Sequence, residues 1–412
     1  MIWAAFLINP FLTLLYAFRR YRLPSAKNIM WAFTVFFALT IAVGKESGGS
    51  DIVVYMAEVE LIYNDGIGLQ NLYTYFLSTG EIEVIRSFLA VLVAQFTSSG
   101  YILLLFYGFI FGYFFSRNMW FVFNKLEGKL KVITILLLFC LFLITPIWKL
   151  GGFRFWTATH VFIYGLLPYL YSGKKKSLIW CFTAPWIFHY AFILPALVLA
   201  GFLLSQLLLR GNLLLYFSFF IVSIILGEID IRQFNQYVET YAPSDFAERS
   251  DGYRSEYQVK IRREVDLFGS GKNWYAVLYQ KTLHWSLMAF LLILYFKSKA
   301  LIYLDKNLIR VLSFTYLFFG VANIMSSIPS GNRYLAPASI LAASILAIYI
   351  QNRPQERLMG RAIKVALPLL ALFVIVSFRQ GFYFTSVTTI FGNPLIALFT
   401  IGENLSLNDI IK

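Results

Sequence analysis

The amino-acid sequence predicts an all-α, polytopic integral membrane protein with about 12 transmembrane helices, in a range of roughly 10 to 13, and two long outer loops. Composition is the first observation behind this prediction. Of the 412 residues, 59% are apolar and only 14% are charged, and the mean hydropathy is +0.69. A soluble domain is usually about half apolar and a quarter charged. These features argue against a soluble enzyme, a disordered protein and a nucleic-acid-binding domain.

The second observation is a series of apolar runs near the ~20 residues that a membrane-spanning helix needs. The first run lacks a basic leader and an Ala-x-Ala cleavage site, so we expect a retained helix and not a cleaved signal peptide. The predicted spans are 2–18, 28–44, 101–117, 131–148, 154–171, 177–190, 191–209, 212–227, 275–296, 309–327, 334–350 and 363–381.

The third observation is the position of the basic residues, which flank these runs. Cytoplasmic segments of membrane proteins carry an excess of Lys and Arg. The net charge of +14 is therefore interpreted as this positive-inside signal and not as a nucleic-acid site, and both termini are predicted to face out. The groups placed inside are Arg19, Arg20, Arg22 and Lys27; Lys125, Lys129 and Lys131; Lys174, Lys175 and Lys176; Lys297, Lys299 and Lys306; and Arg353, Arg357, Arg361 and Lys364.

The segment 177–209 decides the orientation of everything after it. It is too long for one untilted span. Divided into two helices with a turn near Pro185–His189, it keeps every later basic group inside, and we adopt that division. We expect one membrane domain over 1–412, with outer loops at 45–100 and 228–274. Within the first loop, 87–100 is apolar but short, which suggests an interfacial or re-entrant segment.

Ionisable residues near membrane-spanning segments are the candidate functional residues, because burying them is costly. In GGFRFWTATH (151–160), Arg154 is placed at the outer end of a helix and His160 about two turns deeper. The alternatives are that Arg154 reaches into the headgroup region and that His160 is a neutral imidazole bonded to a neighbouring helix. In APWIFHY (184–190), His189 and Tyr190 occupy an outer turn. His189 either accepts a proton or bonds a phosphate, or it is a histidine bonded to backbone carbonyls at a helix end.

Further arginines are predicted on the same outer side. SSIPSGNRY (326–334) places Arg333 and Tyr334 in a tight turn, whose Pro, Gly and Asn are explained by turn chemistry. Arg379 ends the last span and Arg86 closes the first outer segment. Guanidinium groups that converge on one face can bind phosphate. The alternative is that some of them anchor helices among lipid headgroups.

SGGSDIVVY (47–55) places Asp51 and Tyr55 four residues apart, on one face if this segment is helical. The alternative for Asp51 is a solvated loop acid. The sequence contains no H-x-x-H, H-E-x-x-H, G-x-S-x-G or phosphate-cradling G-x-x-x-x-G-K-[ST] pattern. It therefore predicts no metal site and no cofactor, and disfavours a serine hydrolase or a nucleotide-driven pump.

Taken in order, these elements resemble the EpsG family, which belongs with the Wzy-type O-antigen and exopolysaccharide polymerases. The resemblance rests on SGGSDIVVY after the second helix, GGFR before a helix rich in small residues, FHYAFILP after a KKK turn, and a late SGNRY. The elements cover about 45–335, and each is short and degenerate. His160 stands where the family leads us to expect a small or apolar residue, and 228–274 matches no known element.

The resemblance implies a metal-independent glycosyltransferase that joins undecaprenyl-diphosphate-linked repeat units on the outer, periplasmic side of the bacterial cytoplasmic membrane. Arg154 and Arg333 would neutralise the leaving diphosphate, and His189 or Asp51 would accept the proton of the attacking hydroxyl. The expected substrate-binding residues are Arg86, Arg379, Tyr55, His160, Tyr190 and Tyr334.

The expected partners are the lipid-linked oligosaccharide and the lipid bilayer, with a chain-length regulator and a flippase as further candidates and no nucleic acid. Four alternatives stay open from the residues: an O-antigen ligase, a lipid-linked glycosyltransferase, a flippase or other transporter, and a membrane acyltransferase. The aromatic residues near the proposed site also fit an interfacial belt.

Overall fold

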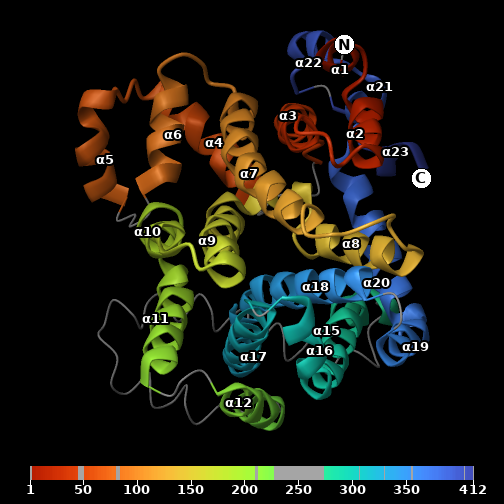
Figure 1. Ribbon diagram of the computed structural model, residues 1–412. Coiled ribbons are helices and arrows are strands. Elements are labelled where there is room, and N and C mark those ends of the chain that lie inside the picture. The colour runs from red at the N-terminus through yellow and green to blue at the C-terminus, as the bar shows by residue number, and fades with distance from the viewer. Residues whose placement is uncertain are drawn as a thin grey trace. The chain divides into compact units, whose positions relative to one another are not determined.

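A computed structural model of the chain describes residues 2–44, 51–79, 84–208, 212–226, 273–305, 307–328, 330–353, 356–402 and 404–411 (Figure 1). These residues form helices joined by turns, and across those ranges the only β pairing is an isolated bridge between Ser386 and Ser406. The predicted class, an all-α polytopic membrane protein, is confirmed.

Each predicted span contains a helix, although the helices differ in length. Within the described residues, seven stretches are long and apolar enough to cross a membrane: Gly100–Phe123, Val132–Ser172, Tyr190–Leu208, Trp274–Phe296, Asn307–Met325, Gly331–Asn352 and Leu367–Phe384. Shorter apolar helices are α3 (Ala26–Thr40), α6 (Val84–Ala94) and α12 (Leu213–Leu226).

The run 2–18, predicted as one helix, is two helices, α1 (Ile2–Ile8) and α2 (Pro10–Arg19). Asn9 caps the second helix, since its side-chain oxygen accepts a hydrogen bond from the Leu12 amide at 2.8 Å. Pro10 follows at the first helical position, where its missing N–H is not needed. The break therefore follows from a cap and a proline that are both visible in the sequence.

The division of 177–209 into two helices is confirmed. A 3₁₀ turn, η4 (Lys175–Leu178), leads into α10 (Ile179–Ile187), and η5 (Tyr190–Phe192) leads into α11 (Ile193–Leu208). The first outer segment also contains helices, namely α4 (Asp51–Asn64), η2 (Leu69–Asn71), α5 (Leu72–Thr79) and α6. Nearly all of the predicted loop 228–274 lies outside the described residues.

The chain divides into two compact units. Unit 1 contains Met1–Leu126, Thr145–Ala196 and Ser377–Lys412, and unit 2 contains Glu127–Ile144 and Leu197–Val376. Helix α20 (Leu367–Phe384) runs from unit 2 into unit 1. The prediction of a single membrane domain stays a prediction.

Unit 1 is built around the packing of α7 (Gly100–Phe123) on α3 and on α9 (Phe153–Ser172). Gly108 and Gly112 form a G-x-x-x-G pattern, which lets helix backbones approach closely in a membrane protein. A Cβ atom on Gly108 would lie 2.4 Å from the Ala38 Cβ, and one on Gly112 would lie 2.8 Å from the Thr34 Cβ. These glycines therefore fix how α7 lies against α3. Unit 1 also contains η3 (Ile147–Gly152), α21 (Val387–Phe391), α22 (Pro394–Phe399) and α23 (Leu407–Ile411).

Unit 2 is built around α18 (Leu335–Asn352), whose residues are nearly all buried. It packs against α8 (Val132–Ile144), α15 (Trp274–Phe296) and α17 (Asn307–Met325). The unit also contains α16 (Ser298–Leu304), η7 (Gly331–Tyr334) and α19 (Arg357–Val365).

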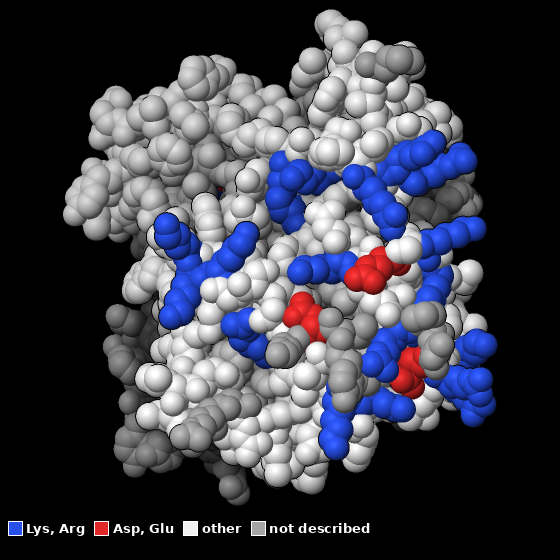
Figure 2. Space-filling model, in the orientation of Figure 1, with Lys and Arg blue, Asp and Glu red and all other residues white. Residues whose placement is uncertain are grey.

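Lysine and arginine side chains are prominent on the face of the protein drawn in Figure 2, with few acidic side chains among them. The membrane orientation stays a prediction.

Candidate active site

One face of α4 provides the framework of the candidate site in unit 1. Asp51, Tyr55 and Glu58 follow one another at intervals of four and three residues, so they lie along the same side of the helix. The exposure of these three side chains differs along that face. Asp51 is exposed at the start of the helix, whereas Tyr55 is only 3% exposed. The helix thus leads from an open rim into a buried interior.

A buried ion pair joins α4 to α6. The Arg86 guanidinium donates a hydrogen bond to one oxygen of the Glu58 carboxylate, and the two side chains are 6% and 13% exposed. Tyr75, from α5, donates its hydroxyl hydrogen to the other Glu58 oxygen at 2.8 Å. Buried ions are stable only when they are paired and hydrogen-bonded, and the contacts to Glu58 meet that requirement.

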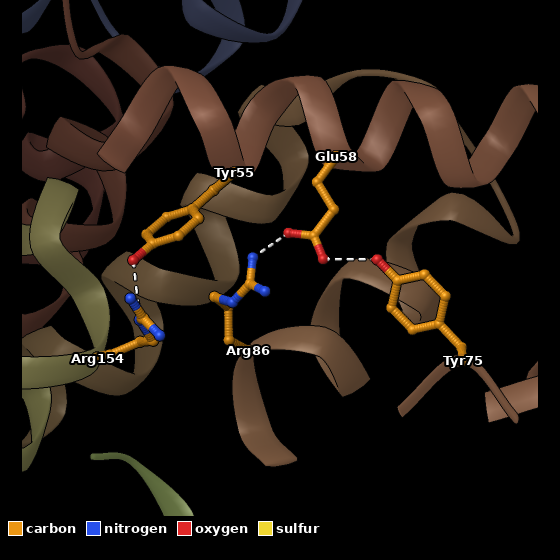
Figure 3. A network of polar contacts seen from close by, with 5 residues as sticks. All are labelled: Tyr55, Glu58, Tyr75, Arg86 and Arg154. Atoms are coloured by element: carbon orange, nitrogen blue, oxygen red, sulfur yellow. Dashed lines mark hydrogen bonds and ion pairs between the residues drawn. The ribbon is translucent and has the colours of Figure 1, made fainter. Parts of the chain in front are cut away.

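Arg154, in the first turn of α9, completes the group (Figure 3). Its Nε donates a hydrogen bond to the Tyr55 hydroxyl oxygen at 3.0 Å. The guanidinium carbons of Arg86 and Arg154 lie 5.0 and 5.9 Å from the centre of the Tyr55 ring. Two cations from different helices are therefore held on one tyrosine. We call Tyr55, Glu58, Tyr75, Arg86 and Arg154 the arginine–tyrosine cluster.

The rim of this cluster is formed where α4 meets the GGFR segment. A Cβ atom on Gly152 would lie 3.9 Å from an Asp51 carboxylate oxygen and 2.9 Å from the Trp156 indole. The carboxylate of Asp51 thus lies next to the turn that leads into Arg154, which is itself partly exposed. The N-terminal end of a helix such as α9 also carries partial positive charge. The rim accordingly combines a carboxylate with a positively charged helix end.

The two tyrosines of the cluster remain protonated at neutral pH. Burial raises the pKa of the Tyr55 phenol above its ordinary value of 10.0, and the Arg154 guanidinium opposes part of that shift. Burial and the hydrogen bond to the Glu58 carboxylate raise the pKa of Tyr75. A neutral phenol both donates and accepts hydrogen bonds. Tyr55 can therefore accept from Arg154 and still donate its own hydrogen.

His189 lies at the turn between α10 and α11, as predicted. Its Nδ1 accepts a hydrogen bond from the Ala191 amide at 3.4 Å and so caps η5. Its ring contacts Phe155 and Tyr190, the second of which is exposed. The alternative expected from the sequence was bonding to backbone carbonyls, whereas the contact made by Nδ1 is to a backbone amide. The predicted catalytic role of His189 stays a prediction.

His160 lies deep within unit 1 and is fully buried. Its Nε2 lies 3.0 Å from the Thr145 hydroxyl, and its Nδ1 lies 3.3 Å from the Asn118 side-chain nitrogen. Phe111 and Phe115 contact its ring edge-on. This environment corresponds to the alternative of an imidazole bonded to neighbouring helices. Its predicted role in substrate binding stays a prediction.

Arg333 and Tyr334 belong to unit 2, where η7 precedes α18. Arg333 is exposed and Tyr334 is buried. The turn is tightly built, because Ser330 has a φ of 60° and a Cβ on Gly331 would lie 1.9 Å from the Met325 carbonyl oxygen. Arg379 is exposed on the part of α20 that belongs to unit 1.

The structure therefore brings together four of the residues singled out in the sequence: Asp51, Tyr55, Arg86 and Arg154. Sequence reasoning missed Glu58 and Tyr75. Glu58 shares a helix face with Asp51 and Tyr55, and this spacing was an available signal for it. Tyr75 had no comparable signal, since its position depends on how α5 folds back.

No group of three or more His, Cys, Asp or Glu side chains within the described ranges is arranged to hold a metal ion. The cluster instead presents guanidinium and phenol groups, which suit an anionic, oxygen-rich ligand. The fold and this site define a polytopic, all-α membrane protein with a partly buried arginine site.

Within this class, the comparison with family models shows the family to which the chain belongs. The model of the EpsG family matches residues 28–387, which is most of the chain, so the protein belongs to the EpsG family. Members of this family are Wzy-type polymerases, and the assignment implies a membrane-bound polysaccharide repeat-unit polymerase. Neither the curated proteins nor the solved structures gave a match to this chain.

Proposed function

We propose that the protein polymerises undecaprenyl-diphosphate-linked oligosaccharide units into O-antigen, capsule or exopolysaccharide. The bond between the anomeric carbon of the donor and its diphosphate oxygen breaks. A new bond forms between that carbon and a hydroxyl oxygen of the acceptor unit. The hydroxyl proton passes to a base, and undecaprenyl diphosphate leaves as an anion. Because the donor unit is carried on this lipid, no nucleotide sugar is consumed.

The observation that carries this proposal is the position of Arg154. The Gly152 turn that leads into it lies next to the exposed Asp51, and its Nε bond to Tyr55 fixes the direction of the guanidinium. A fixed donor in a partly buried site stabilises charge that grows on a leaving group without having to reorganise. We assign diphosphate binding to Arg154. Arg333 and Arg379 keep the phosphate-binding role expected of them from the sequence. Arg86, paired with Glu58, also contacts the Tyr55 ring.

Asp51 is our first candidate for the base. It is a carboxylate at the rim, close to the turn that leads into Arg154, where an acceptor hydroxyl can approach. His189 is the second candidate. Its Nδ1 already accepts from the backbone, so Nε2 would have to take the proton. Tyr190 and Tyr334 are proposed to contact sugar rings or the lipid.

The proposed location is the outer face of the bacterial cytoplasmic membrane. That side follows from the basic flanks of the helices, which are predicted to face the cytoplasm. The lipid-linked oligosaccharide would reach the site from the bilayer. A flippase would supply it and a chain-length regulator would limit the product, both as candidate partners.

The experiment uses the purified full chain in nanodiscs with the lipid-diphosphate-linked repeat unit and no nucleotide sugar. We expect a ladder of products on a gel, together with released undecaprenyl diphosphate. The ladder should persist in EDTA, since the sequence offers no metal-ligand pattern. Transfer to another acceptor without a ladder would indicate a ligase, and movement of the substrate across the bilayer would indicate a transporter.

A further inference from the structure

Tyr107 of α7 is a fully buried tyrosine next to the arginine–tyrosine cluster. Its ring stacks on Phe153, with 3.8 Å between ring centres and 4° between ring planes. It also meets the Tyr55 ring edge-on at 6.0 Å. Its side chain is 0% exposed, and its hydroxyl makes no hydrogen bond to any residue that the structure describes.

The Tyr107 hydroxyl lies in range of the charges of the cluster. It interacts electrostatically with Arg86, Glu58 and Arg154, as well as with the Tyr55 phenol. The residue is thus close to Arg154, to which we assign the diphosphate. Phe153, on which it stacks, immediately precedes Arg154 in the chain, so both belong to the first turn of α9.

A phenylalanine would fill the same space without burying a polar group. The neighbouring residues of α7 include Phe106, Phe109 and Phe111, so the helix accepts that side chain readily. A buried hydroxyl without a partner lowers the stability of the fold. Packing alone therefore does not account for tyrosine at position 107.

We propose that the Tyr107 hydroxyl is a ligand-binding donor that completes its hydrogen bond on a diphosphate oxygen of the lipid carrier. This inference rests on the proposed function and deepens it. The hydroxyl is already removed from water in the free protein, so binding does not require its dehydration. A fixed donor of this kind acts together with Arg154 on the same developing charge.

The test is Tyr107→Phe, which removes only the hydroxyl oxygen and its hydrogen. We expect the thermal midpoint to stay equal or to rise, because an unsatisfied buried group is removed. The polymerisation rate should fall about 100-fold, the usual effect of losing one such donor. Calorimetry should show that undecaprenyl diphosphate, used as the probe, binds at least about tenfold more weakly, which a purely structural role would not produce.

Tyr316→Phe is the matched control. Tyr316 of α17 is also fully buried, but its hydroxyl donates to the Leu291 carbonyl oxygen at 2.7 Å. Removing that hydroxyl leaves an unpaired carbonyl, so we expect a lower thermal midpoint with unchanged probe binding and unchanged activity per folded molecule.

The outcomes separate this inference from the proposed function. If the wild-type protein builds a ladder and Tyr107→Phe does so at the same rate with the same affinity for the probe, the assignment of Tyr107 is overturned while the polymerase remains. If the wild-type protein builds no ladder, the proposed function fails, and calorimetry still decides whether Tyr107 contributes to binding. A lower thermal midpoint with unchanged affinity would make Tyr107 a structural residue.

Discussion

A set of buried or partly buried polar side chains in unit 1 differs in kind from a set in unit 2. The arginine–tyrosine cluster of unit 1 contains guanidinium and carboxylate groups. In unit 2, His284, Asn323 and Ser223 form what we call the amide network. Nε2 of His284 bonds the Asn323 side-chain oxygen at 3.1 Å, and the Asn323 side-chain nitrogen donates to Ser223 at 3.1 Å.

Polar groups are buried in a membrane protein either to link helices or to serve a function, and the two sets differ in this respect. Side chains such as Asn and Ser link helices by hydrogen bonds, and the amide network joins α12, α15 and α17 in this way. Guanidinium and carboxylate groups are far more costly to bury than amides. A fold that only needed to join α4, α6 and α9 could use amides, so the charges of unit 1 support the proposal of a site there.

The largest expected effect is on stability, through the buried ion pair. Glu58→Gln leaves the Arg86 charge buried without its carboxylate and should lower the free energy of unfolding by about 3–5 kcal/mol. Adding Arg86→Met removes the second charge and should restore most of that loss. Thermal unfolding of both single variants and the double variant measures the coupling. Additive losses would show that the pair does not act as a unit.

The next effect is on activity. Arg154→Ala and Arg333→Ala should each reduce polymer formation about 100- to 1000-fold, or ~2.7–4 kcal/mol, with single-unit lipid intermediates accumulating. Arg353→Ala is the control for Arg333. The two arginines flank α18, whose 18 residues span about 27 Å, so they lie at opposite ends of one helix. Normal chain length in either test variant would remove that arginine from the site.

A smaller effect is expected in the amide network. Asn323→Ala should lower the free energy of unfolding by about 1–3 kcal/mol, because His284 and Ser223 lose a hydrogen-bond partner. Activity per folded molecule should not change. Unfolding curves and a gel assay on the same preparation measure both quantities. A loss of activity larger than the loss of folded protein would mean that the amide network itself contributes to the reaction.

The smallest effect concerns pH and Tyr55. Its folded pKa lies above the ordinary value of 10.0, so the phenol is neutral in both folded and unfolded states between about pH 6 and 9. Its contribution to stability is fully present there and is lost as the pH rises above about 10. The difference in thermal midpoint between the wild type and Tyr55→Phe should be flat up to pH 9 and then shrink. A difference that widens with pH would contradict the neutral buried phenol.

Much of the fold could be predicted, because hydrophobicity along a membrane chain is a local property. The division of 177–209 followed from keeping basic flanks on one side. The break at Asn9–Pro10 was missed although its cap and proline are local signals. Asp51 and Tyr55 were correctly placed on one helix face, since their spacing alone decides it.

The pairing of Glu58 with Arg86 could not be predicted, because it depends on how α4 and α6 fold against each other across 28 residues of sequence. Tyr107 was not singled out for a similar reason. In a span rich in aromatic residues, the sequence does not distinguish one tyrosine from another, because the difference lies in their tertiary contacts. Tertiary contacts, more than residue type, distinguish the candidate site from the rest of the core.

The glycine contacts between α3 and α7 have a consequence for how this protein tolerates mutation. Tyr107 directly precedes Gly108, so the register of α7 on α3 also sets the position of the Tyr107 hydroxyl relative to the cluster. A larger side chain at Ala38 would push α7 aside and misplace that hydroxyl without touching the cluster itself. Substitutions in α3 should therefore show epistasis with residues of the candidate site, and sequence change in one helix will be tolerated only when the other compensates.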